Sequence, residues 1–237
     1  NEPGHGEEIG PVPAVRLGAG VFEQPRPHRS AHGGQPRRIG LLVSRPASVV
    51  RGSQSGGAVT PRAFASSADT RPRAKSFEVL SDGVCALTSE GDPNVGAIEG
   101  EDFLVCFEAL ATPFAAQGWL AELRQHTDKP IWYLVLSHYH AVRVLGASAF
   151  DADVVVAHEQ SRHLILERGL EDWASELGMM PRLFERPETI PGFTLPSLTF
   201  SDRLTIPLGG NRGDLLLQHC GRGHTAGDIV AWLPSSA

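Results

Sequence analysis

The alternation of apolar and polar positions changes near residue 75. Residues 1–75 are rich in Pro, Gly, Ser and Arg and contain few large apolar side chains, whereas short apolar runs recur from Ser76 onward. We therefore predict a disordered basic tail over 1–75 and a globular domain over 76–237. Bounded by turn residues, the first four apolar runs predict the strands of a meander at 77–80, 84–88, 94–98 and 103–107.

The middle of the domain predicts a strand–helix–strand crossover. Thr112 and Pro113 predict a helix start, because threonine is a good N-cap and proline fits the first helical position. The helix is predicted to run to Thr127 and to stop before Pro130. The apolar run 131–136, IWYLVL, then predicts a buried strand. A crossover between parallel strands is expected to be right-handed.

The C-terminal half predicts further helices and strands, several of them in a second sheet. Gly169 is expected to end one helix, because glycine is the usual residue just after a helix end. The helices are expected at 142–150, 159–168 and 171–177. The strands are expected at 153–157 and 229–233, with strands of the second sheet at 198–200, 204–208 and 215–219.

A long irregular segment separates the last helix from the second sheet. The segment 179–196 contains four prolines, and such stretches in compact domains are often binding loops. It either shapes a pocket or simply covers the core. Candidate apolar walls of the pocket are Trp173, Phe184 and Phe193.

Charge is divided unevenly along the chain. Residues 1–75 hold 11 Lys and Arg against 5 Asp and Glu, and the rest holds 10 against 22. The tail loosely resembles an organellar transit peptide, and basic tails also contact nucleic acid or anionic lipid. It lacks the aromatic interleaving and the amphipathic pattern of such segments, so we predict no nucleic acid and no membrane partner. A further expectation is that the tail is translated from upstream of the natural start, since the first methionine is Met179.

Composition excludes several protein classes. No segment reaches the roughly 18 apolar residues of a membrane span, and the glycine fingerprints of nucleotide sites are absent. The cysteines have no metal-clip spacing, so Cys85 and Cys106 are expected to be buried apolar residues and Cys220 a core thiol at a strand end. So few cysteines argue against a disulfide-rich secreted scaffold, and we expect a cytoplasmic location.

Histidines follow the predicted central strand. His138 and His140 come just after Leu136, and side chains two positions apart on an extended segment point the same way. A His-x-His pair alone is weak evidence for a metal. A third histidine, His224, lies in the glycine-rich segment GRGHTAGD after another predicted strand. Glycines let such a loop approach a site closely, and three histidines are the ligand count of an open zinc site.

The other histidines have simpler explanations. His158 follows a predicted strand, so it faces the cleft, caps the next helix or is exposed at the surface. His126 is expected to be exposed at a helix end, and His163 to be structural on its helix. His219 lies on a strand and is expected to be a core or surface residue.

The two histidine segments together resemble the metallo-β-lactamase superfamily. The match consists of HYH at 138–140 between a strand and a helix, and of GHTAGD at 223–228 about eighty residues later. The run HYHAVRVLG resembles a divergent branch, and the resemblance extends from about Ser76 to the C-terminus. It implies an α+β fold, a four-layer αβ/βα sandwich, of which we expect the C-terminal part to be missing.

The sequence departs from that family at two positions of the second metal site. Val142 stands where the family usually has a metal-binding Asp, and Arg143 where it has a histidine. The resemblance therefore implies a single Zn²⁺ per chain. Its ligands would be the three histidines of the first site, His138, His140 and His224.

Three residues are candidates for the role that Val142 cannot fill. Asp228 matches a family position that usually steadies a ligand. Tyr139 either donates to a developing oxyanion or is an ordinary packed tyrosine. Arg143 either holds an anionic substrate or pairs with an acid, Asp228 or another.

The implied function is zinc-dependent hydrolysis of a small-molecule substrate. Zinc lowers the pKa of a bound water to about 7, and the hydroxide would attack an ester, thioester, lactone or amide-like bond. The alternative is a degenerate, inactive member of the fold that acts as a binding or scaffold protein. A di-iron redox site is disfavoured, because Val142 replaces the carboxylate ligand. The sequence predicts neither the substrate nor the oligomeric state.

Overall fold

The computed structural model describes residues 73–89 and 91–234. All the described residues lie in one compact unit. The predicted disordered tail therefore falls almost wholly outside the described residues. None of the described helices combines the length and the apolar character needed to cross a membrane.

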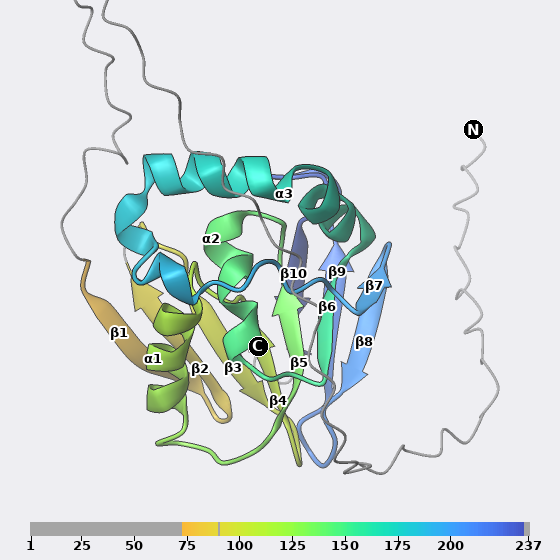
Figure 1. The fold of residues 1–237 in the computed structure, drawn as a ribbon. Helices are drawn as coiled ribbons and strands as arrows, with labels where there is room; N and C mark the ends of the chain where they lie inside the picture. Colours follow the sequence, from red (N-terminus) through yellow and green to blue (C-terminus); the bar gives the residue numbers. More distant parts are fainter. Residues whose placement is uncertain (1–72, 90, 235–237) are drawn as a thin grey trace, which may run out of the picture. The chain divides into compact units, whose positions relative to one another are not determined.

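The core of the fold is two β-sheets (Figure 1). In the larger sheet the first four strands pair antiparallel and the last four pair parallel. Its strands follow sequence order: β1 (Lys75–Ser81), β2 (Val84–Ser89), β3 (Val95–Glu99), β4 (Leu104–Phe107), β5 (Ile131–Leu136), β6 (Val154–His158) and β7 (Leu198–Phe200). The smaller, antiparallel sheet comprises β8 (Arg203–Pro207), β9 (Asp214–His219) and β10 (Ile229–Trp232).

The predicted strands are all present, but one lies in the other sheet. β7 was expected in the second sheet, and it instead pairs parallel with β6, with Leu198 opposite Val156. Ser197 fixes this pairing, because its amide donates to the carbonyl oxygen of Val155 over 2.8 Å. The predicted crossover from β4 through a helix to β5 is also confirmed, since β4 and β5 pair parallel.

The described residues form three layers, and side chains along the central strands alternate between the two apolar clusters that separate these layers, except at Trp132 and Tyr133, which both face the same cluster. Leu134 and Leu136 face one apolar cluster, which they share with helix residues such as Trp119. Val135 faces the opposite cluster, which contains the inner side of the smaller sheet. Figure 1 shows α1 (Pro113–Leu123) and α2 (Ala141–Val144) on one face of the larger sheet, with α3 (Glu159–Met179) across one end of the strands.

Two of the helix predictions need correction. The segment 142–150 is not one α-helix: α2 gives way to a 3₁₀ helix, η1 (Leu145–Ala149). Here Gly146 lies so close to the loop between β4 and α1 that a Cβ would be 2.0 Å from the Ala109 carbonyl oxygen. Gly169 was wrongly expected to end a helix. It keeps a helical conformation inside the 21 residues of α3, and the ring of Phe193 packs against it.

The predicted start of α1 is confirmed, whereas its end differs. Thr112 caps α1, accepting a hydrogen bond from the amide of Ala115 over 3.1 Å, and Pro113 is its first residue. The helix ends at Leu123, a turn before the predicted Thr127. The proline-rich segment after α3 holds two short 3₁₀ helices, η2 (Pro181–Leu183) and η3 (Pro187–Thr189).

Candidate metal centre

The parallel strands β4 to β7 end at one edge of the larger sheet, and the segments that follow them meet there. After β5, the chain bends at Ser137 and His138, and His140 takes the extended conformation of a helix N-cap before α2. His138 is 8% exposed and His140 is half-buried. Their ring centroids are 5.0 Å apart, as the spacing of two positions predicted.

The loop between β9 and β10 brings the third histidine to this edge. Ile229, at its end, donates its amide to the carbonyl oxygen of Ser137 over 3.1 Å, which ties the two histidine segments together. Within the loop, the Thr225 amide and hydroxyl both donate to the carboxylate of Asp228. Gly227 lies against α3, where its carbonyl oxygen accepts a hydrogen bond from the Ser161 hydroxyl over 2.8 Å. A Cβ on Gly227 would be 2.4 Å from that hydroxyl, so only glycine fits.

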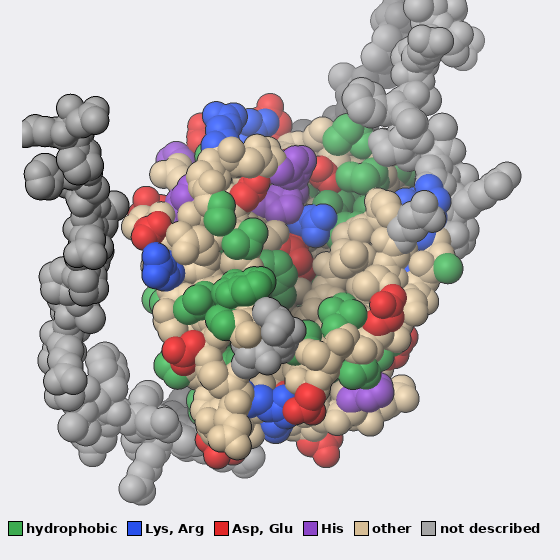
Figure 2. All heavy atoms as spheres, turned by 180° about the vertical axis from the view of Figure 1, so that it is seen from behind, with side chains coloured by type: hydrophobic (Ala, Val, Ile, Leu, Met, Phe, Trp, Pro, Cys, Tyr) green, Lys and Arg blue, Asp and Glu red, His purple; other side chains and the backbone are tan. Residues whose placement is uncertain are grey.

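The three predicted ligands come together. One ring nitrogen from each of His138, His140 and His224 lies within 4.8 Å of the other two. The nearest pair, Nε2 of His224 and Nδ1 of His140, is 3.1 Å apart. Two nitrogens bound to one tetrahedral zinc at 2.0–2.1 Å would be about 3.3 Å apart, so this spacing already fits a shared ion. Figure 2 shows histidine side chains gathered beside a hollow near one end of the molecule, with acidic and basic side chains next to them.

Burial favours the neutral form of two of the imidazoles, those of His138 and His140. Burial, followed by the positive charge of Arg143, lowers the pKa of His138 to about 3. Burial also lowers the pKa of His140, against the opposing charge of Asp172. A neutral imidazole is the form that binds a metal, so these two rings need lose no proton near pH 7.

His138 and His140 each have one ring nitrogen with a partner outside the cluster. His138 Nδ1 lies 2.8 Å from the Ser137 hydroxyl, and His140 Nε2 lies 3.8 Å from a carboxylate oxygen of Asp172. Outer contacts of this kind orient metal-binding histidines and raise their basicity. The donor set and its surroundings therefore fit a zinc ion at the three-histidine cluster.

The three predicted catalytic residues lie around the cluster in different settings. Asp228 is held by Thr225: burial alone would raise its pKa, but these hydrogen bonds outweigh it and lower the pKa. Tyr139 is buried with its ring edge-on to His140, at 4.6 Å between centroids, and burial raises its pKa. Arg143 pairs with Glu108 over 3.6 Å and not with Asp228. Their catalytic roles stay predictions.

Val142 has an apolar role. It is 6% exposed and belongs to a cluster with Ala141, Leu145 and Phe184. The position at which the resembling family has a metal-binding carboxylate is thus part of the core.

Three buried acids at this edge were not predicted from the sequence. Glu108 follows β4 with a positive φ of 70°, and its carboxylate accepts a hydrogen bond from the Ser137 amide over 2.8 Å. Asp172 and Glu176 lie on α3 and form a second group of possible ligand atoms with His140, all within 4.8 Å. The only available signal was their four-residue spacing, which places both on one face of a helix.

The remaining histidines and cysteines lie outside the cluster. His158 caps α3, accepting a hydrogen bond from the Gln160 amide, so the capping alternative is confirmed. His219 is bound to the Asp228 carbonyl oxygen over 2.8 Å, and His163 is exposed and pairs with Glu167. His126 is exposed just beyond α1 and stacks on Phe77. Cys106 is buried and Cys85 partly buried, but Cys220 is exposed, because it lies one residue past the end of β9.

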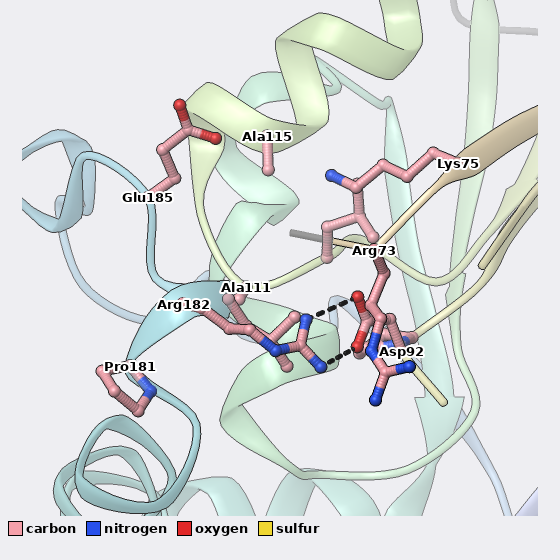
Figure 3. Close-up of a pocket in the computed structure, with 11 residues that line it drawn as sticks. Arg73, Lys75, Asp92, Ala111, Ala115, Pro181, Arg182 and Glu185 are labelled. Atoms are coloured by element: carbon pink, nitrogen blue, oxygen red, sulfur yellow. Dashed lines mark hydrogen bonds and ion pairs between the residues drawn. The ribbon is translucent and has the colours of Figure 1, made fainter. Parts of the chain in front are cut away.

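The proline-rich segment both covers the core and borders a cavity. Phe184 is buried, and Trp173 and Phe193 pack against its apolar cluster, so these three predicted walls belong to the core. A cavity of about 530 Å³ lies beside η2, and none of the three histidines lines it. Figure 3 shows Arg182 of η2 pairing with Asp92 through two hydrogen bonds in this cavity.

The carboxyl group of Glu176 gives a prediction for stability. Burial, followed by the charge of Asp172, raises the pKa of Glu176 to about 7. A carboxyl whose pKa is higher folded than unfolded destabilises the fold as pH rises from the unfolded value through the folded one. In the metal-free chain, Glu176→Gln is therefore expected to raise the melting temperature at about pH 8.5 and not at about pH 5. Thermal melts with a chelator present test this, and an equal shift at both pH values would contradict it.

Of three comparisons with known proteins, the one with solved structures found similar folds. No family model matches the sequence, and a search of curated proteins gave no match. A solved structure of a double mutant of the sec-alkyl sulfatase PisA1 superposes with a TM-score of 0.52 and 24% identity, over 68% of this chain and 30% of that one. A metallo-β-lactamase from Pontibacter korlensis superposes with a TM-score of 0.50 and 19% identity, over 68% of each chain. The predicted fold is confirmed: the described part of this chain has the metallo-β-lactamase fold.

Proposed function

We propose that this chain is a hydrolase that holds one zinc ion on His138, His140 and His224. The observation that carries the proposal is that two loops bring three imidazoles together, with one nitrogen of each within 4.8 Å of the others. The rings of His140 and His224, whose nearest nitrogens lie 3.1 Å apart, are 84 residues apart in the sequence. Burial of the His138 ring and partial burial of the His140 ring remove them from water, which costs free energy unless their ring nitrogens find partners. A shared cation explains why they converge.

The surrounding residues would orient the ligands and hold the two loops. When bound by three imidazoles, zinc lowers the pKa of a coordinated water to about 7 and polarises a carbonyl. The Ser137 hydroxyl would fix the ring of His138, and the carboxylate of Asp172 would fix that of His140. Asp228, through its bonds to Thr225, holds the turn that carries His224. The proposed substrates are small molecules with an ester, thioester, lactone or amide-like bond.

Arg143 would bind the negatively charged group of an acidic substrate. Its guanidinium is about one-third exposed and lies near enough to His138 and His140 to lower the pKa of both. It also compensates the buried carboxylate of Glu108, so removal of its charge would destabilise the fold as well. The informative substitution is therefore Arg143→Lys, which keeps a positive charge but loses the planar guanidinium.

Arg143→Lys is expected to raise KM for substrates with a carboxylate by about 10-fold, which is about 1.4 kcal/mol, and to leave KM for neutral analogues unchanged. Steady-state kinetics on a charged and a neutral ester of the same alcohol measure this, with the melting temperature as a control for folding. Equal changes for both esters would assign Arg143 a structural role only.

The central test of the proposed function combines metal analysis with turnover. The full chain, stripped with a chelator and reloaded with Zn²⁺, is expected to bind about one ion at the three-histidine cluster and to hydrolyse at least one member of a panel of esters, thioesters, lactones and amides. Activity should return with zinc and disappear with the chelator. A chain that binds no zinc would refute the proposal. Bound zinc without turnover across the panel would favour the alternative, a binding or scaffold protein.

A further inference from the structure

We propose that His140, Asp172 and Glu176 form a second divalent-cation site beside the three-histidine cluster. The inference rests on the proposed function in one respect, since His140 would belong to both sites. The site takes its carboxylates from α3, so it does not depend on position 142, where Val142 replaces the carboxylate of the resembling family. It differs from that family's second site in every carboxylate ligand.

The geometry brings three ligand groups together. Asp172 and Glu176 are four residues apart on α3, so both side chains lie on the face that packs toward α2. One atom from each of these carboxylates and one nitrogen of His140 lie within 4.8 Å of one another. Within this group His140 Nε2 lies 3.8 Å from Asp172 Oδ1.

Both carboxylates are buried, and within the described ranges neither forms an ion pair with a lysine or arginine. Glu176 is 7% exposed, and its buried Oε2 has no hydrogen-bond partner among the described residues. Asp172 is 8% exposed: its Oδ2 accepts a hydrogen bond from the Ala141 amide over 2.8 Å, and its Oδ1 lies 3.8 Å from His140 Nε2. Two neighbouring buried carboxylates cost free energy unless a cation compensates them. A divalent ion would satisfy the open oxygen and offset both charges.

The ring of His140 has one nitrogen for each site. Its Nδ1 lies 3.1 Å from His224 Nε2, and its Nε2 lies on the side of Asp172. When the second ion binds, the ring would release its remaining proton to solvent and ligate one cation through each nitrogen as an imidazolate. One imidazole and two carboxylates suit Mn²⁺ as well as Zn²⁺, whereas three imidazoles favour Zn²⁺. The two sites are therefore expected to differ in metal preference.

Titration with Mn²⁺ tests the second site. The full chain is loaded with one equivalent of Zn²⁺ and titrated with Mn²⁺, with free Mn²⁺ followed by EPR and bound zinc by elemental analysis. We expect uptake of about one Mn²⁺ per chain with zinc retained. Glu176→Gln should weaken Mn²⁺ binding by at least about 10-fold, the lower bound for changes around metal sites. Glu167→Gln, an exposed change on the same helix, is the matched control and should bind Mn²⁺ like the unmodified chain.

Histidine variants separate the two sites. His138→Ala should lose zinc and keep Mn²⁺, Glu176→Gln should keep zinc and lose Mn²⁺, and His140→Ala should lose both. Asp172→Asn provides a second carboxylate variant should Glu176→Gln fail to fold, and it should also lose Mn²⁺. No Mn²⁺ uptake by the zinc-loaded chain, or unchanged uptake after both carboxylate substitutions, would overturn the second site and leave the proposed function standing. Uptake that depends on Glu176 in a chain that binds no zinc would refute the proposed function alone.

Discussion

Replacing His224 by alanine is expected to abolish both zinc binding and hydrolysis. His224 is the only one of the three histidines on the glycine-rich loop, and its Nε2 lies 3.1 Å from His140 Nδ1. Without it two imidazoles remain, which is fewer than the three protein ligands of an open zinc site. Zinc affinity should fall by more than about 100-fold, the upper end for changes outside the ligand set. Competition with a chromophoric chelator measures the affinity, and turnover of the best substrate in the panel measures activity.

The control for His224→Ala is His163→Ala. His163 is also a solvent-accessible histidine, but it lies on α3 and pairs with Glu167. It should keep about one zinc per chain and full activity. If both variants lose zinc equally, the metal is bound unspecifically. If His224→Ala keeps its zinc, the three-histidine site is wrong.

Gly146→Ala is expected to destabilise the domain by about 3 kcal/mol or more, the upper end for overpacked cores. An added Cβ would be 2.0 Å from the carbonyl oxygen of Ala109 and 2.9 Å from that of Thr112. Both are backbone atoms, so neither is able to move as a side-chain end would. Gly146 also donates its amide to Leu110 over 3.1 Å, a bond that a shift of η1 would break. Urea unfolding followed by circular dichroism measures the loss.

Gly118→Ala is the matched control. Gly118 lies inside α1, and a Cβ there meets nothing within 4 Å. Alanine is the better helix former by about 0.8–1.0 kcal/mol, so this variant should be slightly more stable than the unmodified chain. A Gly146→Ala chain as stable as Gly118→Ala would contradict the close approach of η1 to the loop before α1.

Local patterns predicted the strands and the capped start of α1, because period-two alternation and Thr-Pro at a helix start are written in neighbouring residues. Two predictions, the helix end at Gly169 and the sheet to which β7 belongs, were wrong because they depend on tertiary contacts. Gly169 would end an isolated helix, but Phe193 packs on it from a distant loop and α3 continues. β7 was assigned to the wrong sheet, since the choice depends on the bond between Ser197 and Val155, 42 residues apart.

The candidate centre was predictable only where its residues share a short motif. His138 and His140 are two positions apart, and the glycines around His224 mark a loop that approaches closely. Nothing in the local sequence distinguished Asp172 and Glu176 from solvent-facing acids of an amphipathic helix. Their burial depends on how α3 lies against α2, which is a property of the assembled fold.

The length of α3 joins parts of the centre that are far apart in sequence. Near the start of α3, Ser161 donates a hydrogen bond to the loop that carries His224. Eleven residues later, Asp172 accepts a hydrogen bond from Ala141, the first residue of α2, directly after His140. In a straight helix these two anchors are roughly 16 Å apart. Because both segments are bonded to the same helix, a tilt of α3 would move both sets of ligands together. Amide exchange at Thr225 and at Ala141 should therefore slow together when zinc binds.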